Sequence, residues 1–126
     1  MNLLLDTHAF LWAVSDPQRL SAKARVAIQD GDNMVFVSAA TAWEIAIKKA
    51  IGKLKIPLDS YLDELEVHRF TQLNITAEHA LAVEYLPMLH TDPFDRLLIA
   101  QAQIEKLVLV TRDARIGEYV IQTIEA

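Results

Sequence analysis

The sequence predicts an α/β protein built on an open, mainly parallel β-sheet with helices on both faces. Its 126 residues are the usual length of a single domain. Short apolar runs that end at a polar residue alternate with longer segments of helical period. Only three glycines and four prolines interrupt the chain, and no linker-like stretch divides it, so we expect one domain over residues 1–126.

Three continuous apolar runs have the composition of strands that are buried on both faces, which is typical of a parallel sheet. They occupy residues 3–5, 34–37 and 107–110 and are followed by Asp6, Ser38 and Thr111. Two further short strands are predicted at residues 70–73 and 119–124.

Helical patterns fill the segments between these runs. We expect helices at residues 7–14, 21–30, 39–51, 57–66, 76–85 and 93–106. Ser21 is placed to cap the second of them, and Gly52 stands where a glycine commonly ends a helix. Segment 93–106 is apolar over more than half of its circumference, so we expect a buried helix there.

The composition narrows the classes of function. The chain has 12 basic and 17 acidic residues, a net charge of −5, which argues against capture of a nucleic-acid backbone by the whole surface. It has no cysteine, which excludes disulfides, a thiolate zinc site and a cysteine nucleophile, so a bound metal would take carboxylate, His or water ligands. The first residues do not form a leader peptide, and no apolar stretch approaches the roughly 20 residues of a membrane span. We therefore expect a cytoplasmic protein.

Four acidic residues are predicted to meet at one edge of the sheet. Asp6 and Asp113 follow strands, Glu44 lies in the helix after the second strand, and Asp95 lies in the first turn of the last helix. Ligands of open α/β sheets bind beyond the carboxyl ends of the strands. Carboxylates brought together there repel one another, and a divalent cation is the usual compensation.

Each of these acids also has a structural interpretation. Asp95 could complement the helix dipole, Glu44 could form an exposed pair with Lys48, and Asp113 could cap a helix. Other chemistries lack their motifs, since the chain has no glycine-rich phosphate loop, no Gly-x-Ser-x-Gly and no His-Glu-x-x-His. His8 and His90 flank the acidic positions, without the spacing of metal ligands.

Four motifs in this order resemble the PIN-domain family, and most of all the VapC-type toxin ribonucleases of toxin–antitoxin modules. They are Asp6-Thr7-His8, the segments 37–48 and 90–102, and the segment 109–113 that ends in Thr-Arg-Asp. Each motif alone is weak evidence, whereas the set is specific and spans essentially the whole chain. The resemblance implies a single PIN-like nuclease domain that uses Mg²⁺, or Mn²⁺, to hydrolyse RNA.

The resemblance also assigns roles to individual residues. Asp6, Glu44, Asp95 and Asp113 match the four acids that hold the metal, and Thr111 matches a supporting hydroxyl residue. Thr7 and Asp92 are further supporting candidates, and Asp92 could instead cap the helix that Pro93 begins. The family further implies an RNA substrate, a homodimer and a small antitoxin that covers the site.

Basic residues near these acids are candidates for RNA binding. They are Lys48, Lys49, Arg96 and Arg112, with Lys53 and Lys55 close by. The lysines could equally be an ordinary exposed helix end. Two other classes of function stay open, a non-catalytic RNA-binding module and a phosphoacceptor receiver-like domain, although a receiver needs paired acids where Asp6 stands alone. A phosphatase of the Asp-x-Asp type is disfavoured because position 8 is His.

Overall fold

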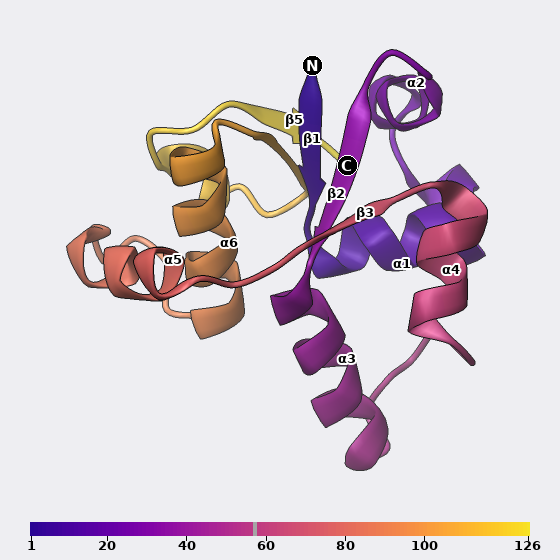
Figure 1. The fold of residues 1–126 in the computed structure, drawn as a ribbon, viewed down its shortest axis with the longest axis horizontal. Coiled ribbons are helices and arrows are strands. Elements are labelled where there is room, and N and C mark those ends of the chain that lie inside the picture. Colours follow the sequence, from indigo (N-terminus) through magenta and orange to yellow (C-terminus); the bar gives the residue numbers. More distant parts are fainter. Residues whose placement is uncertain (57) are drawn as a thin grey trace.

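The computed structural model describes residues 1–56 and 58–126, which form five parallel strands in one sheet. The sheet order is β3-β2-β1-β4-β5 (Figure 1). The strands are β1 (Asn2–Leu5), β2 (Met34–Ser38), β3 (Thr71–Leu73), β4 (Val108–Thr111) and β5 (Thr123–Glu125). The predicted parallel sheet is confirmed. A phosphoacceptor receiver has the strand order 2-1-3-4-5, so the receiver-like alternative is wrong.

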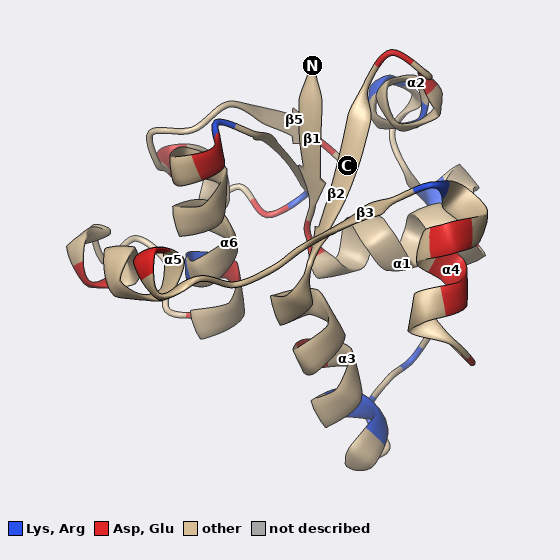
Figure 2. Cartoon of the chain, viewed as in Figure 1, with Lys and Arg blue, Asp and Glu red and all other residues tan. Residues whose placement is uncertain are grey.

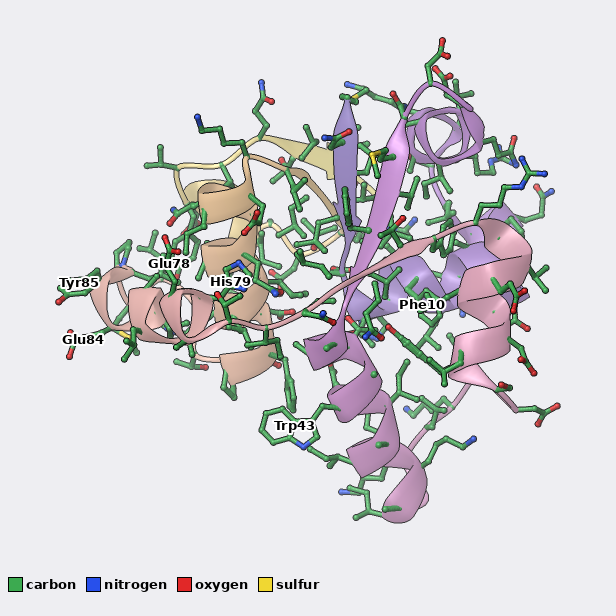
Figure 3. The ribbon with its side chains drawn as sticks, viewed as in Figure 1. Phe10, Trp43, Glu78, His79, Glu84 and Tyr85 are labelled. Atoms are coloured by element: carbon green, nitrogen blue, oxygen red, sulfur yellow. The ribbon has the colours of Figure 1, made fainter. Side chains whose placement is uncertain are left out.

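Helices cover both faces of the sheet, as predicted. They are α1 (Thr7–Ser15), α2 (Ala22–Gln29), α3 (Ala39–Ala50), α4 (Tyr61–His68), α5 (Ala77–Ala82) and α6 (Pro93–Glu105). Leu3 and Leu5 of β1 face one hydrophobic core and Leu4 faces the other, because side chains alternate along a strand. Phe10 of α1, labelled in Figure 3, packs in the first core. Its ring centroid lies 5.4 Å from that of Tyr61.

Local signals explain several helix ends. Ser21 caps α2 by accepting a hydrogen bond from Ala24 N, as expected. Gly52 follows α3 with φ of 69°, the left-handed conformation that glycine adopts without a steric penalty. In α6, Leu98, Ile99 and the neighbouring small residues are buried, which confirms the expected buried helix.

Two predicted elements differ from the structure. Helix α4 begins at Tyr61 because the Ser60 side chain caps it, and Pro57, where the helix was expected to start, lies outside the described residues. The last strand covers Thr123–Glu125 and not residues 119–124. Tyr119 instead lies in the second core, and its hydroxyl donates to Pro87 O at 2.7 Å.

The parallel arrangement brings the carboxyl ends of β1, β2 and β4 to one edge of the sheet (Figure 1). Asp6 follows β1 directly and its backbone N–H donates to Val110 O at 3.1 Å, which joins it to β4. Helices α1 and α3 both begin at this edge. None of the helices in the described part of the chain is long and apolar enough to cross a membrane.

Candidate metal centre

The four predicted acids, Asp6, Glu44, Asp95 and Asp113, line one cavity of about 360 Å³. They come from four separate parts of the chain, namely the β1–α1 junction, α3, α6 and the loop after β4. The remaining lining residues are a fifth acid, Asp92, and polar, basic or aromatic side chains. They are Thr7, His8, Trp12, Lys48, His90, Asp92, Arg112 and Arg115.

Asp6 is a buried carboxylate that caps helix α1 and whose ionised form is disfavoured by burial. Its Oδ1 accepts a hydrogen bond from Ala9 N at 2.8 Å and so caps α1. Only 6% of the residue is exposed, and burial raises the pKa of Asp6 to about 6. Hydrogen bonds from Thr111 and Ala9 oppose this rise, while the charges of Glu44 and Asp113 add to it. Asp6 therefore lies within electrostatic reach of two other predicted ligands.

Glu44 is held by partners on both carboxylate oxygens. Oε1 accepts from the Thr7 hydroxyl at 2.6 Å and Oε2 accepts from Lys48 Nζ at 2.7 Å. The pair with Lys48 was expected from the sequence, but Glu44 is buried and does not lie on an exposed face. Thr7 also contacts the Thr41 hydroxyl at 3.2 Å, which links the start of α1 to α3. Thr7 thus fixes the orientation of the Glu44 carboxylate.

Asp95 and Asp92 divide two tasks at the start of α6. Asp92 Oδ1 accepts from Phe94 N and Asp95 N, so Asp92 caps the helix that begins at Pro93. Burial raises the pKa of Asp95 to about 6, and the charges of Asp92 and Asp6 raise it further. Asp95 is therefore more than a partner of the helix dipole, since it shares a cavity and an electrostatic field with the other acids.

His90 lies between two of the acids, a placement that the sequence indicated only by proximity. Its Nε2 is 2.8 Å from Asp95 Oδ2 and 3.0 Å from Asp113 Oδ2. Its Nδ1 accepts a hydrogen bond from Asp92 N at 3.3 Å, which leaves the ring proton on Nε2. This N–H therefore faces both carboxylates and offsets their mutual repulsion.

Arg115 was not predicted, although it is the main partner of Asp113. Its backbone N–H and its Nε both donate to Asp113 Oδ1, at 2.9 and 3.2 Å, and a terminal nitrogen donates to Oδ2 at 3.1 Å. The Arg115 guanidinium holds the pKa of Asp113 below its ordinary value. Thr111 also contributes here, because its hydroxyl accepts from Asp113 N at 3.1 Å. The sequence signal was an Arg two residues after the acid, which is common in exposed turns and therefore weak.

The predicted basic residues fall into two groups. Lys48 and Arg112 line the cavity, whereas Lys49 donates to Leu58 O at 2.6 Å and does not line it; both lysines lie at the blue end of α3 in Figure 2. Arg96 needs correction, because it is buried and its guanidinium donates to four backbone carbonyls and the Tyr119 hydroxyl. It fixes the loop before α6 and cannot contact RNA.

The donor set of the cavity fits a hard divalent cation. Carboxylate oxygens are the ligands that Mg²⁺ and Mn²⁺ prefer, and the chain offers no thiolate. Asp95 and Asp113 each offer a carboxylate oxygen within 4.8 Å of the other, and His90 lies between them as a hydrogen-bond donor. The pKa values of Asp6 and Asp95 are raised first by burial and then by neighbouring carboxylates, and a bound cation would oppose both effects.

Comparisons with known proteins identify the family and agree with this fold. A family model described as the PIN domain matches residues 3–121. Ribonuclease VapC22 from Mycobacterium tuberculosis is 37% identical over 121 residues, which are 94% of this chain and 92% of that protein.

Solved structures share the fold at low identity. VapBC2 from Rickettsia felis, in a crystal structure bound to a DNA fragment from their promoter, has a TM-score of 0.72 at 16% identity, over 98% of both chains. DNA-bound VapBC from Salmonella typhimurium has a TM-score of 0.64 at 16% identity, over 98% of this chain and 97% of the other. FitAcB from Neisseria gonorrhoeae has a TM-score of 0.57 at 18% identity, over 98% of this chain and 96% of the other.

Proposed function

The chain belongs to the PIN domain family, and from that premise we propose that it is a metal-dependent endoribonuclease, the toxin of a toxin–antitoxin module. The observation that carries the proposal is the convergence of four carboxylates from distant parts of the chain on one cavity at the carboxyl edge of a parallel sheet. The relative named as a ribonuclease shares 37% identity with nearly the whole chain, which supports the same activity here.

Asp6, Glu44, Asp95 and Asp113 would hold Mg²⁺ or Mn²⁺, directly or through water. When bound, such an ion lowers the pKa of a coordinated water and neutralises charge on the phosphodiester. The protein's own contribution is to fix the ligands. Thr7 orients Glu44, and Thr111 holds the turn of Asp113.

Basic groups at the rim make the acidic cavity accessible to a phosphodiester. A polyanion is repelled by four carboxylates, so cations must accompany them. Lys48 and Arg115 are already paired with Glu44 and Asp113, and Arg112 lies at the same rim. These three side chains are the candidates for contacts with the RNA backbone beside the scissile bond.

The proposed activity is tested by incubating the purified chain with a pool of structured and unstructured RNAs, with Mg²⁺, with Mn²⁺ and with EDTA. We expect defined cleavage products with either ion and none with EDTA. Asp6→Asn keeps the side-chain acceptor that caps α1, so it should fold and yet lose activity by at least about 100-fold. An Asp6→Asn variant that cleaved RNA as fast as the unsubstituted chain would refute the assignment.

The alternative of a non-catalytic RNA-binding module gives a different result in the same experiment. Such a module would bind RNA and leave it intact with every metal. A toxin with one narrow target would also leave most RNAs intact, so the pool must contain transfer, ribosomal and messenger RNA. Mapping the 5′ ends of the products by sequencing then identifies the target and the cleaved bond together.

An antitoxin is the protein partner that this function requires. The solved neighbours named VapBC support such a partner; both are bound to DNA, and in the Rickettsia felis structure the DNA is a fragment of their promoter. The net charge of −5 disfavours DNA binding by the whole surface of this chain, so we expect the partner to supply the DNA contacts. If a small gene lies next to the gene for this chain, co-expression with its product should give a complex that suppresses RNA cleavage and binds the promoter, whereas the isolated chain should not bind it.

A further inference from the structure

We propose that the exposed face of α1 beside the carboxylates binds the base of an unpaired RNA nucleotide, which stacks on the side chains of Arg112 and Trp12. This inference rests on the proposed ribonuclease function and adds a subsite that would receive one base of the substrate. It is carried by the geometry of four residues at the rim of the cavity.

Helix α1 has a buried face and a rim face. Ala9, Phe10 and Ala13 point into the core. His8 and Trp12 are one helical turn apart on the rim face, with ring centroids 5.8 Å apart, and both line the cavity that holds the acids. Because Asp6 caps α1, this aromatic face begins directly at the proposed metal ligands.

Two guanidinium groups lie over the Trp12 ring. The guanidinium carbon of Arg19 is 5.7 Å from the ring centre and that of Arg112 is 4.4 Å from it, so Arg112 is the nearer group. Nε and a terminal nitrogen donate to Ala126 O at 3.0 and 2.6 Å, and the same nitrogen also donates to Arg19 O, so the guanidinium is fixed in place. Arg112 nevertheless remains exposed to solvent.

This construction matches the chemistry of an unpaired nucleotide. Proteins bind splayed RNA bases by stacking them on aromatic rings or on guanidinium planes. A base on the Arg112–Trp12 surface would carry its phosphates toward Lys48 and Arg115 and the scissile bond toward the acids, since all of these side chains line one cavity. A duplex does not present a free base face, so single-stranded RNA is the class that fits.

The test is a binding cycle in the Asp6→Asn background, which leaves the RNA uncut. A short unstructured RNA labelled with fluorescein is titrated by anisotropy, and a series of RNAs carries one abasic ribose at successive positions. We expect one abasic position to weaken binding roughly 10-fold, as loss of a single base stack does. In Arg112→Lys and Trp12→Leu the same abasic position should cost almost nothing further, because the stacking partner is already absent.

Two controls separate stacking from charge and from folding. Arg112→Lys keeps the positive charge, so the slope of log affinity against log salt should be unchanged while the affinity falls. Arg25→Lys makes the same chemical change on α2, where Arg25 is half-buried, donates to Gln18 and does not line the cavity of the acids, and should leave both quantities unchanged. Trp12 packs partly on the core, so the melting temperature of Trp12→Leu is compared with that of Arg112→Lys.

The outcomes distinguish this inference from the proposed function. If metal-dependent cleavage is intact and the abasic scan is identical in the unsubstituted and substituted chains, the stacking surface is wrong and the ribonuclease proposal stands. If a folded chain neither cleaves nor binds any RNA, both are wrong. Loss of binding to a partner protein alone, with RNA binding preserved, would assign the surface to that partner and overturn the inference.

Discussion

Removing the charge of Asp6 should stabilise the metal-free protein while it abolishes activity. The folded state raises the pKa of this buried carboxyl from 3.8 to about 6, so at neutral pH the ionised side chain opposes folding. At about 1.4 kcal/mol per pH unit this cost is about 3 kcal/mol. Asp6→Asn keeps a side-chain oxygen to accept from Ala9 N and removes the charge. For a chain of this length we expect a rise in melting temperature of roughly 10 °C at pH 8 without metal.

The stabilisation by Asp6→Asn should depend on pH in a defined direction. A carboxyl whose folded pKa is raised contributes stability below its unfolded pKa, and that contribution is lost as the pH rises through its folded pKa. The difference in stability between Asp6→Asn and the unsubstituted chain should therefore be close to zero near pH 4, grow between pH 4 and about pH 6, and stay constant above pH 7. Thermal unfolding by circular dichroism at five pH values measures this profile.

A matched control tests the physical cause. Asp32→Asn removes the same charge from an exposed turn, where burial cannot oppose ionisation, so its melting temperature should stay within about 2 °C of the unsubstituted chain at every pH. Addition of Mg²⁺ should stabilise the unsubstituted chain and have little effect on Asp6→Asn. A melting temperature of Asp6→Asn that is unchanged or lower at pH 8 would refute the reasoning that burial makes this carboxylate costly.

Three further predictions concern the support of the site and the assembly. His90→Ala removes the N–H between Asp95 and Asp113, and we expect Mn²⁺ affinity measured by calorimetry to fall by about 10-fold, with partial recovery in His90→Gln; equal affinities would exclude this positioning role. Arg96→Leu leaves buried carbonyls without donors and should lower the free energy of unfolding in urea by about 3 kcal/mol or more, whereas a loss below 1 kcal/mol would contradict it. The family resemblance predicts a homodimer, so the 14.2 kDa chain should sediment at about twice its mass, and a monomer at all concentrations would exclude this.

Much of the fold could be predicted because burial on both faces leaves a plain signal. Residues 3–5 are all Leu, and a strand of this composition fits the centre of a sheet that is covered on both faces. The last strand was misplaced because it carries one buried apolar residue, Ile124, whereas the more apolar segment around Tyr119 packs against the loop before α6. An edge strand of three residues is defined by its pairing with β4, which no local pattern encodes.

The acids of the site could be predicted for a topological reason and their partners could not. Asp6 and Asp113 follow parallel strands, and parallel strands end at the same edge whatever their side chains do. Their partners are placed by loop conformation and by side-chain rotamers, as is the case for His90, Arg96 and Arg115. Arg96 illustrates the difference, since adjacency to Asp95 suggested an RNA contact, but helix geometry directs the two side chains to opposite environments.

The pairing of charges inside the cavity explains how an acidic protein can act on RNA. In the metal-free chain Lys48 pairs with Glu44 and Arg115 pairs with Asp113, while the His90 N–H faces two carboxylates. The two basic side chains are therefore occupied by the acids and are not available to RNA. A bound divalent cation would satisfy the same carboxylates and leave Lys48 and Arg115 free to contact phosphate. RNA affinity should therefore increase with metal by more than the ion's own charge provides. We expect added Ca²⁺ to increase the RNA affinity of the Arg115→Ala variant by less than it increases that of the unsubstituted chain. An equal increase in both chains would show that Arg115 is not released.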